Sequence, residues 1–119
     1  MKHEAIEQKT VVQYLKLRKL LFTSTLGGVR LSIGQATQLK SQGYGKGVPD
    51  ILIFEPRGEY CGLMIELKRI RVKGQNRGKI SPEQKWWKEE LNKRGYCAVI
   101  CEGAGEAISF IENYLKERR

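Results

Sequence analysis

Residues 62–68 read Gly-Leu-Met-Ile-Glu-Leu-Lys, an apolar run that ends with an acid and a base. Because side chains alternate between the two faces of a strand, one face of this run is entirely apolar: Leu63, Ile65 and Leu67. Glu66 and Lys68 then share the other face, about 7 Å apart. Burying such charges is costly unless they are paired or bind an ion. The run therefore predicts either an ion pair at the end of a sheet or a functional site.

A second apolar run, residues 51–54, begins directly after Asp50 and stops before a proline and an Arg-Gly turn. Together with a strand over residues 60–69, it has the pattern of an antiparallel hairpin, which can bring Asp50 beside Glu66. Two neighbouring carboxylates repel each other without a cation, and their oxygens are ligands that Mg²⁺ accepts. We therefore predict a Mg²⁺ or Mn²⁺ site with Asp50 and Glu66 as ligands.

Two further groups of the second strand fit the same hypothesis. The backbone carbonyl of Leu67 can add a ligand to the metal ion. Lys68 can orient or deprotonate an attacking water, or neutralise negative charge on a phosphorus centre. A bound metal ion also lowers the pKa of water. These residue types predict metal-assisted hydrolysis of a phosphodiester.

The remaining patterns predict one mixed α/β domain over residues 1–119, with a single sheet and helices on its faces. The expected elements follow the order α β α β β α β α: residues 4–18, 20–25, 33–42, 51–54, 60–69, 81–94, 96–101 and 106–118. The inner face of the first helix should carry Val11, Val12 and Leu15, and that of the last helix Ile108, Ile111 and Leu115.

Three local patterns add detail. Glycines 43, 45 and 47 predict a flexible loop, and the basic, glycine-containing residues 71–80 predict a mobile one. Residues 81–84, Ser-Pro-Glu-Gln, form a capping box with Pro at the first helical position. Trp87 shares a helix face with Gln84 and Leu91, so we expect it in the core.

The composition favours a nucleic-acid partner. Lys and Arg number 22 against 13 Asp and Glu, and the net charge of +9 attracts polyanions. Ribosomal and anionic-membrane proteins share this property. No apolar run is long enough to cross a bilayer, and the first residues lack the pattern of a signal peptide. We therefore expect a cytoplasmic protein.

The three cysteines form no CxxC pair. On a strand, Cys97 and Cys101 share one face, which leaves a metal site open as an alternative. Buried, reduced thiols are favoured because cysteine behaves as a small hydrophobe. Reduced thiols at all three cysteines, Cys61 included, indicate a reducing compartment.

Three segments resemble a known nuclease family. Val48-Pro49-Asp50, followed sixteen residues later by Glu66-Leu67-Lys68, resembles the PD-(D/E)xK signature. More closely, residues 46–50, 62–68 and 81–85 resemble the VRR-NUC branch of that superfamily. The resemblance extends from the first helix to the last. It implies a restriction endonuclease-like fold, a mixed β-sheet core flanked by helices, and divalent-metal cleavage of phosphodiesters.

The resemblance also implies roles for single residues. Asp50 and Glu66 match the metal ligands and Lys68 the catalytic lysine. Gln84 matches a glutamine that supports the site, although the helix cap explains it equally well.

The family places one more glutamate on its first helix, near the metal. Glu4 and Glu7 compete for that role. Glu4 is favoured because it falls in line with Val11 and Leu15 on a helical wheel. A solvated acid at a helix start, stabilised by the helix dipole, remains the alternative.

One departure from the family concerns an early loop. Many members carry Asn-Gly-Gly before a basic residue, whereas this chain has Leu26-Gly27-Gly28-Val29-Arg30.

Basic residues in the loops around the expected site favour binding to a DNA backbone: Arg30, Lys40, Lys46, Arg69, Arg71, Lys73, Arg77 and Lys79. Each of them taken alone is more consistent with a solvated surface charge.

These observations predict a structure-selective, metal-dependent DNA endonuclease. The resemblance to stand-alone members of the family implies a homodimer that cuts four-way junctions. The most specific form of the prediction is therefore a homodimeric Holliday-junction resolvase in a bacterial or phage-infected cell. A twofold substrate suits a C₂ dimer. The alternatives are a flap or nicking endonuclease, a DNA-binding module without catalysis, and a basic protein associated with RNA.

Overall fold

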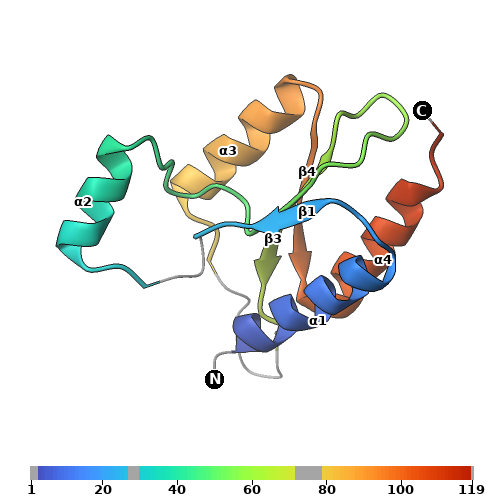
Figure 1. Cartoon of the computed structure of the whole chain (residues 1–119), viewed down its shortest axis with the longest axis horizontal. Coiled ribbons are helices and arrows are strands. Elements are labelled where there is room, and N and C mark those ends of the chain that lie inside the picture. The colour runs from blue at the N-terminus through green and yellow to red at the C-terminus, as the bar shows by residue number, and fades with distance from the viewer. Residues whose placement is uncertain (1–2, 27–29, 72–78, 119) are drawn as a thin grey trace.

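A computed structural model of the chain describes residues 3–26, 30–71 and 79–118, with the side chains of residues 3 and 4 outside the described part. The elements follow one another in the order that the sequence predicts (Figure 1). They are α1 (His3–Leu17), β1 (Phe22–Ser24), α2 (Ile33–Ser41), β2 (Ile51–Ile53), β3 (Leu63–Lys68), α3 (Pro82–Lys93), β4 (Cys97–Glu102) and α4 (Gly103–Leu115).

The four strands form one mixed sheet in the order β1-β2-β3-β4. β1 and β2 are antiparallel, as are β2 and β3, while β3 and β4 are parallel and are connected through α3. In the β2–β3 hairpin, Ile51 lies opposite Ile65. One step further along, this register sets Asp50 across from Glu66, as the hairpin pattern predicts.

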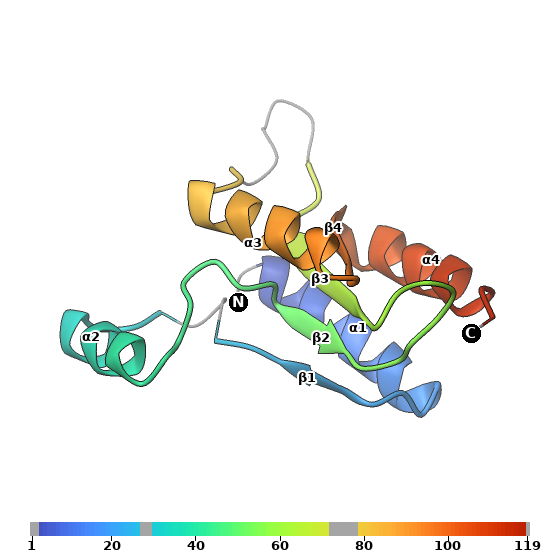
Figure 2. The ribbon, with the colours of Figure 1, turned by 90° about the horizontal axis from the view of Figure 1, so that it is seen from above.

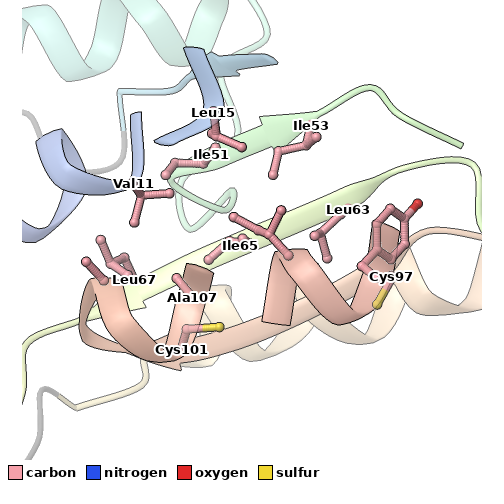
Figure 3. Packing of buried hydrophobic residues seen from close by; sticks show 13 residues of the cluster. Val11, Leu15, Ile51, Ile53, Leu63, Ile65, Leu67, Cys97, Cys101 and Ala107 are labelled. Carbon is pink, nitrogen blue, oxygen red and sulfur yellow. The ribbon is translucent and has the colours of Figure 1, made fainter. Parts of the chain in front are cut away.

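The core lies between the sheet and the helix pair α1 and α4 (Figure 3). The predicted apolar face of β3 is fully covered there, and Val11 and Leu15 of α1 pack on it; Val12 is only partly buried. The buried face of α4 is rotated about the helix axis from the one that its periodicity predicts. Its buried residues are Gly103, Ala104, Ala107, Ile111 and Tyr114, whereas Ile108 and Leu115 are only partly buried.

The opposite face of β3 is also removed from solvent. All six residues of the strand are buried, and Glu66 and Lys68 keep only 7% and 6% of their surface exposed. β3 is a central strand, and contacts from α3 reach this second face. The acid and the base are therefore part of the interior, where each polar group needs a partner.

Two elements begin three residues away from the predicted position. α4 begins at Gly103 rather than Glu106, because Gly103 has a positive φ of 81° that lets β4 turn directly into a helix. Glu106 instead accepts a hydrogen bond from the backbone N–H of Glu102 (2.7 Å). β3 begins at Leu63 rather than residue 60, because Arg57 and Tyr60 close a turn with mutual backbone hydrogen bonds.

The cysteines are free thiols. Cys97 and Cys101 are buried in the core, and burial raises the pKa of both, that of Cys101 to about 12. Glu106 and Cys97 add to the shift at Cys101. Among the described residues, no third His, Cys, Asp or Glu completes a metal-binding group with these two thiols, which disfavours the alternative of a metal site there. No helix among the described residues has the length and apolar character needed to cross a membrane.

Candidate active site

The two carboxylates come from neighbouring strands of one hairpin. Asp50 immediately precedes β2 and is 7% exposed, and Glu66 belongs to β3. The Oδ2 atom of Asp50 accepts a hydrogen bond from the backbone N–H of Leu67 at 2.7 Å. This bond fixes the Asp50 carboxylate at the end of β3, beside Leu67. The backbone carbonyl of Leu67 is the one that the sequence analysis predicts as a further metal ligand.

Gln84 connects the acid and the base of β3. Its Oε1 atom accepts a hydrogen bond from Lys68 Nζ at 2.9 Å, and its Nε2 atom donates to Glu66 Oε2 at 3.2 Å. A carboxamide suits this place because it presents an acceptor to the ammonium and a donor to the carboxylate. Gln84 therefore holds both side chains at a set spacing.

The same amide also caps α3. Gln84 Oε1 accepts from the backbone N–H of Ser81 (3.0 Å), and Ser81 Oγ accepts from the backbone N–H of Gln84 (3.1 Å). The capping box of the sequence is thus confirmed. Capping and contact with Glu66 and Lys68, which the sequence left as alternatives, occur together in one side chain.

Lys68 has a second acceptor in the backbone. Its Nζ atom donates to the carbonyl oxygen of Lys79 at 3.1 Å. An ammonium has three donors, and these two bonds orient it with one donor remaining for a bound group. The contact also ties Lys68 to the segment that leads into α3.

Tyr44 is a residue of the site that the sequence analysis missed. Burial raises the pKa of its phenol, and the negative charges of Asp50 and Glu66 raise it further. The phenol therefore lies within electrostatic reach of both carboxylates. Its position six residues before Asp50 in a glycine-rich segment is the only sequence signal that could have indicated it.

The glycine-rich segment 43–47 packs on α3 instead of forming the flexible loop that its composition predicts. Trp87 Nε1 donates to the carbonyl oxygen of Lys46 at 3.0 Å. A Cβ atom at Gly47 would come within 2.8 Å of the backbone nitrogen of Gln84. Trp87 is consequently a partly buried clamp on this segment, and its prediction as a core residue is wrong.

The two candidate glutamates of α1 have different positions. Glu7 Oε2 accepts a hydrogen bond from the backbone N–H of Ala104 at 2.5 Å, so it caps α4. One carboxylate oxygen of Glu7 is thus bound at the N-terminus of α4. Glu4 belongs to the first turn of α1, but its side chain lies outside the described residues.

The basic residues of the sequence analysis do not form one cluster. Lys46, Arg69 and Lys79 are exposed on segments next to the site, whereas Arg30 and Lys40 are exposed at the two ends of α2. Arg71 is exposed too, and its backbone N–H and guanidinium bind Glu102 (2.8 and 3.3 Å). Lys73 and Arg77 lie outside the described residues.

The donor set fits a hard divalent cation. Asp50 and Glu66 offer carboxylate oxygens from facing strands, and oxygen is the ligand atom that Mg²⁺ prefers. Within the described residues, no group of three or more His, Cys, Asp or Glu side chains is arranged to hold a metal ion. A cation held by two carboxylates would keep the rest of its coordination sphere for water and phosphate oxygens.

Comparisons with known proteins agree with this geometry. The sequence model of the VRR-NUC domain matches residues 3–105. A solved structure described as a VRR_NUC domain protein is 30% identical, with a TM-score of 0.80 over 99% of this chain and 92% of its own. A second, described as a VRR_NUC domain, is 24% identical, with a TM-score of 0.62 over 96% and 99%, and shows likeness of fold. No curated protein matches.

The dual contacts of Gln84 predict an unequal loss of stability at two similar caps. Gln35 closes the same kind of capping box with Ser32 at the start of α2, but has no buried ionic partners. Gln35→Ala should cost about 1 kcal/mol or less. Gln84→Ala should cost about 1 to 3 kcal/mol more, because the buried Lys68 loses an acceptor. Denaturant unfolding measures both, and equal losses would show that Gln84 is only a cap.

Proposed function

Because the chain belongs to the VRR-NUC domain family, a family of nuclease domains, we propose that it is a metal-dependent DNA endonuclease. The observation that carries the proposal is the hairpin register. It sets Asp50 across from Glu66, and Gln84 holds Lys68 beside that pair. Two buried carboxylates next to an ammonium suit a phosphodiester and its metal ion better than they suit a stable core.

Asp50 and Glu66 are the residues that we expect to hold Mg²⁺ or Mn²⁺. The carbonyl of Leu67 is a further candidate, and so is Glu4, because Glu7 is engaged in capping α4. When bound, the metal ion supplies Lewis-acid stabilisation of phosphate charge and acidifies water.

The remaining groups then have separate tasks. Lys68 keeps one donor for the attacking water or for a phosphate oxygen, since Gln84 and Lys79 take the other two. Gln84 positions Lys68 and Glu66. The exposed Lys46, Arg69 and Lys79 surround the site and suit the DNA backbone.

A four-way junction is the substrate that we propose, cut by a homodimer. One chain carries one such site and opens one strand, whereas a twofold junction needs two symmetric cuts. A flap or nicking endonuclease needs only a monomer, and a non-catalytic DNA-binding module has no use for two buried acids.

We expect cleavage to depend on the metal ion and on three side chains. Asp50→Asn and Glu66→Gln should abolish cleavage and keep DNA binding. Asn retains an oxygen that can accept from the N–H of Leu67, so Asp50→Asn preserves the fold. Lys68→Ala should lower the rate by roughly 10² to 10⁴. The assay compares labelled four-way junction, flap, duplex and RNA with Mg²⁺, Mn²⁺ or EDTA.

The exposed Glu112 provides the control for that assay, because Glu112→Gln removes the same charge on α4. Near wild-type cleavage by Asp50→Asn would refute the metal assignment. Cuts in one strand only, or on flaps alone, would favour the flap or nicking endonuclease. Binding without cleavage of any substrate would favour the binding module.

The homodimer is tested by sedimentation velocity at micromolar concentration, with and without junction DNA. We expect a species of twice the 13.6 kDa chain mass under at least one of these conditions. A monomer under both conditions would leave metal-dependent cleavage possible but would remove the symmetric-resolvase proposal.

A further inference from the structure

α2 stands apart from the rest of the molecule in both views of the ribbon (Figures 1 and 2). It has no buried residue, and Ile33 at its start is 89% exposed. A nine-residue helix is marginal in water without tertiary packing. A helix in this position therefore suggests a surface that a partner covers.

The side chains of α2 do not form the face that a protein partner needs. At 100° per residue, Lys40 falls between Ile33 and Ala36, so the apolar residues are interrupted by a charge. Most of the other side chains from the helix cap to its end are uncharged hydrogen-bonding groups: Ser32, Gln35, Thr37, Gln38, Ser41 and Gln42. Amide and hydroxyl groups of this kind contact the phosphates and sugars of DNA.

The charge around α2 also has one sign. Residues 30–49, which include α2, contain no Asp or Glu, although the whole chain has 13, and their three basic residues are Arg30, Lys40 and Lys46. Arg30 precedes α2 and Lys40 lies in its last turn, both exposed. Within the described part of the chain neither takes part in an ion pair. Such a surface complements a polyanion.

α2 is joined to the candidate active site through a segment with fixed contacts. The backbone N–H of Tyr44 donates to the carbonyl oxygen of Leu39 in α2 at 2.9 Å. The next residues pack on α3, because Trp87 donates to the carbonyl of Lys46 and Gly47 lies against the backbone of Gln84. The side chain of Gln84 in turn contacts Glu66 and Lys68. The longest axis of the molecule is 43 Å, equal to about 13 base pairs at about 3.4 Å each.

From these observations we propose that α2 is an arm that lies along the sugar-phosphate backbone of duplex DNA beside the cleaved phosphate. The arm extends the contact with DNA beyond the active site. Because contacts to phosphates and sugars carry no sequence information, it binds the duplex without regard to sequence. The proposal rests on the proposed function for its substrate, but the binding itself requires no cleavage.

The first test is the salt dependence of DNA binding in EDTA, with a 30-base-pair duplex as the probe. The double variant Arg30→Ala/Lys40→Ala should bind at least about tenfold more weakly near 0.1 M salt, and the slope of log K against log salt should fall by about two. The control Lys116→Ala/Arg118→Ala removes equal charge at exposed positions near the C-terminus. Equal effects of the two pairs would overturn the proposal.

The second test is proximity. Gln38 is exposed on α2, and Cys61 is exposed elsewhere, so Gln38→Cys is made together with Cys61→Ser and labelled with a photo-crosslinker. We expect a crosslink to duplex DNA and little from a label at Lys116→Cys in the same background. Crosslinking of Gln38→Cys to a second copy of the chain, and not to DNA, would overturn the proposal.

These readouts separate the arm from the nuclease. If wild-type protein fails to cleave any substrate but the arm variants still lose DNA affinity, the proposed function is wrong and the arm remains. If wild-type protein cleaves and the arm variants bind and crosslink like the controls, only the arm is wrong.

Discussion

The structure depends on one constraint, which is that β3 is buried on both faces while carrying an acid and a base. Its apolar face belongs to the core under α1 and α4. On its other face, Glu66 and Lys68 are almost removed from water and share the amide of Gln84. Because unpaired buried charges are so costly, α3 must begin where Gln84 reaches them. The position of α3, and with it the 43–47 segment clamped on that helix, follows from this need.

The sequence predicted the features that depend on neighbours along the chain. Strand alternation separated Leu63, Ile65 and Leu67 from Glu66 and Lys68, and the hairpin pattern brought Asp50 to Glu66. Local periodicity likewise gave the order of all eight elements. The capping box was visible because Ser81 and Gln84 are three residues apart. Each of these inferences uses a spacing that the backbone geometry fixes.

The features that the sequence did not predict depend on contacts between distant segments. No local sequence pattern indicates that Glu7 caps α4 or that Trp87 donates a hydrogen bond to the carbonyl of Lys46. Likewise, no local pattern indicates that Asp50 and Glu66 raise the pKa of the Tyr44 phenol. Glycines 43, 45 and 47 predicted a flexible loop. In the structure, Gly45 and Gly47 are instead explained by their close packing against α3. α2 was predicted as a helix, but its separation from the core is a property of the assembled fold.

The central claim is that Asp50 and Glu66 together hold a divalent cation. Titration of the DNA-free protein with Mn²⁺, followed by electron paramagnetic resonance of the free ion, tests it most directly. We expect one saturable site per chain that Asp50→Asn removes and that Glu59→Gln, at an exposed acid of a distant turn, leaves intact. Unchanged Mn²⁺ binding by Asp50→Asn would contradict it.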